Sequence, residues 1–201
     1  MADSPSNPAR RRFLTGAATA VGAVGVGFAA VPFLSSFQPS AKAQAAGAPV
    51  DMNIGKLAPG QMTTVAWRGK PVYVVNRTDR MLDSLSEIED RLSDPHSKVA
   101  SQQPEFATNL YRARKEHERY LVIVGLCTHL GCAPTYRPEV APDDLGDDWR
   151  GGFFCPCHGS KFDLSGRVYK GVPAPTNLVV PQYVYITDEI IRVGGTEEDL
   201  A

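Results

Sequence analysis

The sequence predicts a mainly β head built on antiparallel sheet, with a smaller subdomain inserted in it and one transmembrane helix before it. Residues 13–41 contain no charged side chain, which predicts the helix. Short apolar runs separated by Gly, Pro and Asp follow, a pattern typical of strands and tight turns. All the cysteines lie between residues 127 and 157, within the segment that we expect to form this subdomain.

The N-terminus carries an export signal and an anchor. Residues 9–15, Ala-Arg-Arg-Arg-Phe-Leu-Thr, fit the twin-arginine pattern of arginines before Phe-Leu and an apolar run. We assign residues 1–12 to a cytoplasmic segment and 13–37 to a transmembrane anchor, since about 20 apolar residues span a bilayer. Arginines before the span keep the N-terminus in the cytoplasm. We therefore expect a single-pass protein of the bacterial inner membrane with a periplasmic head.

A cleaved signal peptide is the alternative to an anchor, because Ala43-Gln44-Ala45 is an acceptable cleavage site. Residues 38–50 then form a linker rich in alanine, with Pro39, Gly47 and Pro49. Fully extended, such a segment reaches roughly 40 Å. We expect a flexible tether that lets the head move, with a passive spacer or an extra helical turn as alternatives.

Residues 51–201 form the head, which is long enough for one hydrophobic core. Thr78–Leu92 is the expected helix, because its leucines recur at helical spacing and Asp94-Pro95 ends it. Tight turns at Arg68–Lys70 and Asp188–Glu189 join two pairs of strands into hairpins. The expected strands are Met62–Trp67, Pro71–Asn76, Tyr120–Gly125, Gly152–Phe154, Val179–Thr187 and Ile190–Val193.

Two short segments, Cys127–Cys132 and Cys155–Ser160, hold all four cysteines and two of the four histidines. Each segment offers one Cys, one His and one further Cys. Two thiolates and two imidazoles are the ligand set of a Rieske centre, a [2Fe–2S] cluster in which two histidines replace two cysteines on one iron. The sequence therefore predicts one cluster of this type.

The histidines change the chemistry of such a cluster through its charge. Replacing two thiolates by neutral imidazoles makes the oxidised cluster neutral, so it accepts an electron more readily. The reduction potential rises from about −400 mV for plant-type ferredoxins to roughly −150 to +300 mV. This range suits electron transfer from a mild reductant such as a quinol.

Two simpler explanations compete with the cluster. A tetrahedral zinc site needs only four of the six groups and leaves two cysteines unused. Zinc-ligand pairs usually leave two to four residues between them, whereas Cys127 and His129 leave one. Two plain disulfides are the other alternative.

The two motifs resemble those of the Rieske subunit of the ubiquinol–cytochrome c reductase (cytochrome bc-type) complex. The similarity extends into Lys161–Arg167, into Gly171–Pro175, and to the N-terminal anchor and linker. Residues 77–119 have no motif that matches. The resemblance implies a Rieske-type head, with the cluster-binding subdomain at about 126–175.

The resemblance also implies the ligands. Cys127 and Cys155 would bind the inner iron, and His129 and His158 the outer iron. Each histidine would use one ring nitrogen and keep the other near solvent.

Further roles come from the same resemblance. Cys132 and Cys157 would form a disulfide between the two loops, and the hydroxyl of Ser160 would hydrogen-bond a bridging sulfide. Residues 173–175 would cover one side of the cluster. Phe162 stands where many members have a tyrosine whose hydroxyl bonds a ligand thiolate, so that donor is absent here.

The function implied is electron transfer from quinol to a c-type cytochrome. His158 would contact the quinol hydroxyl, and Leu130 would dock in the quinone pocket. The chain would not be catalytic alone, because the pocket belongs to a cytochrome b-type partner. The net charge is −1 and no basic face is evident, so we expect no nucleic-acid partner.

Two other classes remain open. One is the Rieske subunit of a periplasmic molybdenum oxidase such as arsenite oxidase, which is also exported by the twin-arginine route. The other is a soluble Rieske ferredoxin that serves a ring-hydroxylating dioxygenase. The anchor, the export signal and the extra pair of cysteines argue against the second class.

Overall fold

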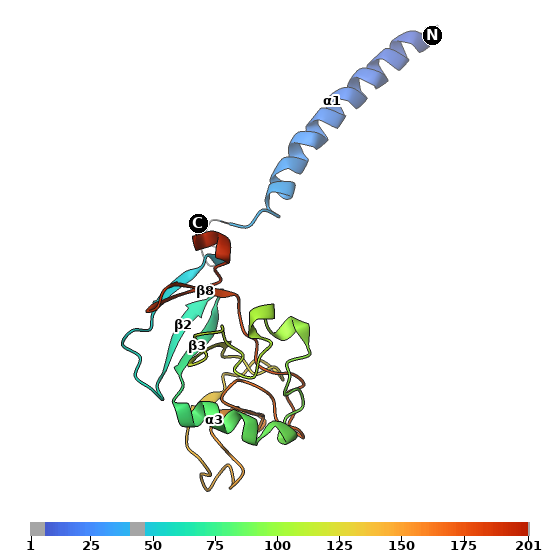
Figure 1. Ribbon diagram of the computed structural model, residues 1–201. Helices are drawn as coiled ribbons and strands as arrows, with labels where there is room; N and C mark the ends of the chain where they lie inside the picture. The colour runs from blue at the N-terminus through green and yellow to red at the C-terminus, as the bar shows by residue number, and fades with distance from the viewer. Residues whose placement is uncertain (1–6, 41–46, 201) are drawn as a thin grey trace. The chain divides into compact units, whose positions relative to one another are not determined.

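The computed structural model describes residues 7–40 and 47–200 (Figure 1). The chain divides into two compact units, an N-terminal one that ends at Ala45 and a head that begins at Ala46. Residues 41–46 of the predicted tether, which include the alternative cleavage motif, lie outside the described residues.

The N-terminal unit is one helix, α1 (Pro8–Ser35), whose 28 residues are long and apolar enough to cross a membrane. It begins upstream of the apolar run because Asn7 caps it. The side-chain oxygen of Asn7 accepts hydrogen bonds from the amides of Ala9 and Arg10 at 3.1 and 3.3 Å. Pro8 occupies the first turn, where its missing N–H is no loss. The predicted apolar helix is confirmed, and none of its side chains is buried.

The described part of the head contains three antiparallel sheets of three strands each. The first has the order β1 (Val50–Asn53), β9 (Ile190–Val193), β8 (Tyr183–Thr187). The second has the order β2 (Met62–Trp67), β3 (Lys70–Asn76), β4 (Tyr120–Val124). The third has the order β5 (Thr135–Arg137), β6 (Gly152–Phe154), β7 (Lys161–Phe162). The predicted fold class, mainly β with one N-terminal apolar helix, is confirmed.

The third sheet lies entirely between β4 and β8 in the chain, so it is an insertion between strands of the other two sheets. β2 and β3 run side by side in Figure 1, and Arg68 and Gly69 connect them. Both connecting residues have positive φ, 51° and 70°, which is the backbone of a two-residue hairpin turn.

The predicted helix Thr78–Leu92 is too long. α3 (Asp79–Glu87) begins after Thr78, whose hydroxyl accepts a hydrogen bond from the amide of Met81 at 3.3 Å. Beyond Ile88 the chain tightens into the 3-10 helix η1 (Glu89–Arg91). Leu92 then forms a β-bridge with Tyr169, which draws the chain out of the helical path.

The predicted strand Val179–Thr187 is also too long, because β8 begins only at Tyr183. Pro181 has no N–H for a sheet ladder, and the amide of Val180 donates instead to the carbonyl of Gln102 at 2.8 Å. The short strands β1, β5 and β7 are not predicted. The remaining short 3-10 helices are η2 (Ala100–Gln102), η3 (Glu105–Ala107) and η4 (Glu197–Leu200).

One main hydrophobic core joins the three sheets. Val74 of β3, Ile123 of β4 and Ile191 of β9 are fully buried in it. Cys127 and Cys155 belong to the same core, so both predicted inner ligands lie where the sheets meet the inserted part. A second, smaller cluster includes residues that flank η1, and its buried members are Ile88, Leu92, Leu145, Trp149 and Tyr169.

Candidate metal centre

The predicted ligands lie on two loops that leave the ends of strands. The first loop, residues 127–132, follows β4, and the second, residues 155–160, follows β6. Because β6 pairs with β5 and β7, the second loop is the tip of a hairpin between β6 and β7. We call these segments ligand loop 1 and ligand loop 2.

The two loops share one backbone pattern. In loop 1 the amide of Cys127 donates to the carbonyl of Cys132 at 2.7 Å, and Gly131 donates back to Cys127 at 2.8 Å. In loop 2 the amide of Cys155 donates to the carbonyl of Ser160 at 2.8 Å, and Gly159 donates back to Cys155 at 2.9 Å.

Each loop thus places a glycine four positions after its first cysteine. Both glycines have positive φ, 81° for Gly131 and 75° for Gly159, which favours glycine over any residue with a Cβ. The same turn therefore holds the first cysteine of each loop. The histidine differs, since His129 is two residues after Cys127 and His158 three residues after Cys155.

The structure brings the predicted ligands of the two loops together in two pairs, one of histidines and one of cysteines. The rings of His129 and His158 lie edge to face, with centroids 4.8 Å apart and planes at 83°. His158 is exposed and His129 half-buried, whereas Cys127 and Cys155 are buried. Burial raises the pKa of the Cys155 thiol, and a hydrogen bond between the Cys155 and Cys127 thiols raises it further.

These four candidate ligands fit a [2Fe–2S] cluster of the Rieske type. Two neighbouring buried thiols can hold an inner iron, and two neighbouring histidines nearer the surface can hold an outer one. A thiol binds a metal as its thiolate, so a metal at this site would favour loss of the proton that burial makes Cys155 retain.

Cys132 and Cys157 form the predicted disulfide, which links the two ligand loops. The sulfur atoms of Cys132, Cys155 and Cys157 lie within 4.8 Å of one another, so the disulfide stands directly beside a candidate ligand. Bonded to each other, Cys132 and Cys157 offer no thiolate. Only Cys127 and Cys155 then remain as thiol ligands.

Ser160 is buried at the end of loop 2. Its hydroxyl oxygen accepts a hydrogen bond from the amide of Ala174 at 3.1 Å. The Ser160 hydroxyl donates no hydrogen bond to any residue that the structure describes, so it can donate to an acceptor within the site. Phe162, two residues further on, is fully buried in the main core.

Residues 174–176, which overlap the predicted covering segment 173–175, contact both ligand loops. Ala174 contacts loop 2 through Ser160, and the hydroxyl of Thr128 in loop 1 donates to the carbonyl of Thr176 at 2.7 Å. Sequence reasoning missed the contact of Thr128, because a threonine between a cysteine and a histidine carries no signal of its own.

Leu130 is the apolar residue at the tip of loop 1. Its side chain is 71% exposed, next to the half-buried His129. The exposed His158 and the exposed Leu130 therefore present an imidazole and an apolar side chain to solvent.

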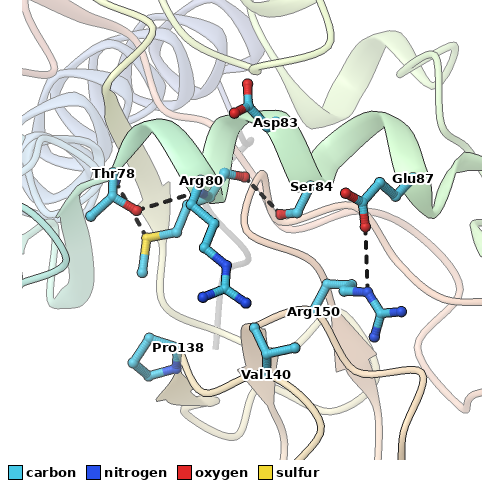
Figure 2. A pocket seen from close by; sticks show the side chains of 9 residues that line it. Thr78, Arg80, Asp83, Ser84, Glu87, Pro138, Val140 and Arg150 are labelled. Carbon is cyan, nitrogen blue, oxygen red and sulfur yellow. Dashed lines mark hydrogen bonds and ion pairs between the residues drawn. The ribbon is translucent and has the colours of Figure 1, made fainter.

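A cavity of about 950 Å³ lies elsewhere in the head, between α3 and the chain around Pro138, Val140 and Arg150 (Figure 2). Glu87 and Arg150 form an ion pair of 3.4 Å across it. Arg80 points into it and makes no hydrogen bond or ion pair with any residue that the structure describes. None of the predicted ligands lines this cavity.

Known families match both parts of the chain. Residues 1–40 match the family described as "Ubiquitinol-cytochrome C reductase Fe-S subunit TAT signal". Residues 89–184 match the Rieske [2Fe-2S] domain. The predicted export signal and the predicted cofactor class are thereby confirmed, and the zinc and plain-disulfide alternatives are not supported.

Close relatives carry one name. A "Ubiquinol-cytochrome c reductase iron-sulfur subunit" of Allochromatium vinosum is 58% identical over 188 residues, which cover 94% of this chain and 89% of that protein. Proteins of the same name from Bradyrhizobium diazoefficiens and Blastochloris viridis are 42% and 44% identical, and each match covers at least 96% of this chain and 98% of the relative. Sequence, ligand loops and relatives agree, and the chain belongs to the family of Rieske iron–sulfur subunits of ubiquinol–cytochrome c reductase.

Proposed function

We propose that this chain takes one electron from quinol and passes it to a c-type cytochrome within a bc-type complex. One observation carries the proposal. His158 is exposed and lies against His129, whose chain neighbour Leu130 is also exposed, while the thiols of Cys127 and Cys155 are buried. Such a site can hold a redox centre away from water and still offer a histidine to a partner.

The proposed ligands are Cys127 and Cys155 for the inner iron, and His129 and His158 for the outer iron. When bound, the cluster supplies a one-electron site, and its reduction places negative charge beside the histidines. Negative charge favours protonation of a neighbouring imidazole. The outward ring nitrogen of His158 can therefore accept the hydrogen bond of the quinol hydroxyl and hold its proton.

Leu130 is proposed to seat the tip of the head in the quinone pocket of a cytochrome b-type partner. An apolar side chain that is 71% exposed gains free energy when a pocket removes it from water. Val140 offers a matched comparison, since its apolar side chain is 43% exposed on a different loop.

The proposed location is the bacterial inner membrane, with the N-terminus in the cytoplasm and the head in the periplasm. The arginines that precede the apolar part of α1 support this orientation. The Cys132–Cys157 disulfide also supports it, because such bonds persist in oxidising compartments. Residues 38–50 are proposed to act as a tether between two docking positions of the head.

The test uses a strain that lacks the gene and is complemented with variants. Wild type should restore electron flow from quinol to cytochrome c in membranes. Leu130→Asp should retain the rhombic EPR signal of the reduced cluster but slow this activity, whereas Val140→Asp should leave both unchanged.

Two outcomes would contradict the proposal. Full quinol–cytochrome c activity in the strain without the gene would exclude the chain from that reaction. Co-purification of the chain with a molybdenum oxidase, rather than with b- and c-type cytochromes, would favour the alternative class. The near full-length relatives do not favour that class.

A further inference from the structure

Three fully buried arginines, Arg77, Arg112 and Arg167, lie in the head. Arginine is rarely buried without paired carboxylates. Asp163 is the only fully buried carboxylate among the described residues. The set therefore places more positive than negative charge in the interior.

All three guanidinium groups converge on one turn, residues 163–167, which we call the arginine-bound turn. Arg77 Nη1 donates to the carbonyl of Leu164 at 3.1 Å and to the hydroxyl of Ser165 at 2.8 Å. Arg112 Nη1 donates to the carbonyls of Ser165 and Gly166 at 3.1 and 3.3 Å.

Arg167 belongs to the turn itself. Its Nε and Nη2 atoms each lie 2.7 Å from Oδ2 of Asp163. The other oxygen of Asp163 accepts from the amides of Ser165 and Arg167 at 2.9 and 2.7 Å. Asp163 is thus fully engaged with Arg167, and neither Arg77 nor Arg112 has a carboxylate of its own within hydrogen-bond distance.

The arginine-bound turn continues directly from ligand loop 2. Loop 2 ends at Ser160, β7 follows, and the turn starts at Asp163. Phe162 of β7 is buried in the same core as Cys127 and Cys155. The turn is therefore joined to the candidate ligands through two residues of strand and through shared packing.

Arg112 also contacts Leu178, which follows the segment 173–175 in the chain. Its Nη2 atom donates to the carbonyl of Leu178 at 2.8 Å, and the amide of Leu178 donates to Gly166 at 2.8 Å. Arg77 and Arg112 come from near the start and the end of residues 77–119, the stretch without a recognisable motif. This stretch supplies the charges that hold the turn.

We propose that Arg77 and Arg112 are positioning residues for ligand loop 2, and that their buried charge raises the reduction potential of the cluster. The inference rests on the proposed function for the identity of the ligands. Its physical basis is that an electron added to the cluster is stabilised by positive charge, and that buried charges are screened far less than surface ones.

The ionisation of the two arginines agrees with this role. Burial lowers the pKa of Arg77 to about 10, and it lowers the pKa of Arg112 to about 10 as well. Both side chains remain charged at neutral pH. The Nε atoms of Arg77 and Arg112 have no hydrogen-bond partner within the described residues, so these charges are not fully compensated.

The test is an EPR-monitored redox titration of membranes that contain the full chain. Arg77→Gln removes a buried positive charge and should lower the potential. Asp163→Asn removes the buried negative charge and should raise it. Arg80→Gln makes the same charge change as Arg77→Gln on an exposed side chain that has no partner among the described residues, and should leave the potential unchanged (Figure 2).

The two variants are expected to shift the potential in opposite directions, which distinguishes an effect of charge from a structural effect. A merely structural role predicts that both buried variants disturb one turn and shift the potential in the same direction, or leave it unchanged. Either result overturns the proposal. Arg77→Lys retains the charge and should restore most of the potential lost in Arg77→Gln; a potential as low as that of Arg77→Gln would contradict a charge effect.

If the variants at Arg77 and Asp163 assemble no cluster, a substitution at a less buried residue can still test the effect of charge on the potential. Glu89 is 37% exposed and its carboxylate lies 3.4 Å from Nη1 of Arg167. Glu89→Gln should raise the potential, while Glu87→Gln, whose partner is Arg150, should not. Equal potentials in these two variants would overturn the proposal. An absent EPR signal in the wild type would instead reject the proposed function.

Discussion

The amide of Ala174 donates a hydrogen bond of 3.1 Å to the hydroxyl of Ser160, and both residues are buried. Ser160 closes ligand loop 2, and Ala174 lies in the segment predicted to cover the cluster. Because the hydroxyl oxygen accepts from Ala174, the hydroxyl keeps its own hydrogen for donation to another group. The contact thus holds in place the donor that the family resemblance implies for a bridging sulfide.

Ser160→Ala should lower the reduction potential, because a hydrogen bond to the cluster stabilises its more negative, reduced form. Hydrogen bonds to charged groups contribute roughly 1.5–3 kcal/mol. For one electron, about 1.4 kcal/mol corresponds to 59 mV, which gives an upper range of roughly 60–130 mV. The bond also exists in the oxidised form, so we expect a shift of tens of millivolts by redox titration. An unchanged potential with full iron content would show that Ser160 does not bond the cluster.

Phe162→Tyr should raise the potential by a similar amount, because it adds the hydroxyl that many family members have at this position. Phe162 is fully buried, so the new hydroxyl must find an acceptor. If the ligand thiolate accepts it, thermal stability stays close to that of the wild type. If the hydroxyl stays unpaired, unfolding becomes easier by about 1–3 kcal/mol and the potential does not move.

Cys127→Ser and His129→Ala should each abolish the rhombic EPR signal, because either change leaves an iron without a ligand. Iron analysis and EPR of membranes measure this directly. His96→Ala is the control, since His96 is an exposed histidine outside both ligand loops and its loss should preserve the signal. A Cys127→Ser protein with stoichiometric iron and an unaltered spectrum would contradict the ligand assignment.

Cys132→Ala or Cys157→Ala should allow some cluster assembly but leave the cluster labile. The bridge joins residues 25 positions apart, and a loop of that size typically contributes about 2–4 kcal/mol. Cluster bleaching on heating should therefore occur at a lower temperature in both variants. The two variants should behave alike, because either one breaks the same bond; a large difference between them would point to another role for one cysteine.

Tyr136→Phe tests an alkaline loss of stability. Burial raises the pKa of Tyr136 to about 12, and its hydroxyl donates to the carbonyl of Gly60 at 3.0 Å. Between pH 10 and 12 the unfolded chain loses a proton that the folded chain keeps, so stability falls as pH rises through this window. In Tyr136→Phe this part of the loss should vanish, which denaturant unfolding at several pH values measures. Parallel pH profiles would show that Tyr136 does not contribute.

Residues whose chemistry is local were predictable from the sequence. The two Cys-His motifs predicted a Rieske [2Fe–2S] cluster, and the match to that domain confirms the cofactor class. The disulfide between Cys132 and Cys157 is also confirmed. The hairpin around Arg68 and Gly69 is confirmed because its turn residues and flanking apolar runs are adjacent in the chain.

Other features depend on distant partners and were not predictable. β1 becomes a strand only because β9 pairs with it, and the helix after Thr78 ends early because Leu92 bridges to Tyr169. The buried arginines are the clearest case. An arginine is normally a surface residue, and only the folded chain brings Arg77 and Arg112 to the turn at Asp163.

The pairing of β1 with β9 also sets the order in which the head can be completed. Val50 and Val193 lie at nearly opposite ends of the head sequence, yet they are partners in one ladder. Such long-range pairing forms slowly and late. A ribosome must therefore release almost the entire chain before the first strand of the head finds its neighbour. A chain truncated by its last hairpin would leave β1 as an open edge, whose unpaired N–H and C=O groups could pair with a strand of another chain.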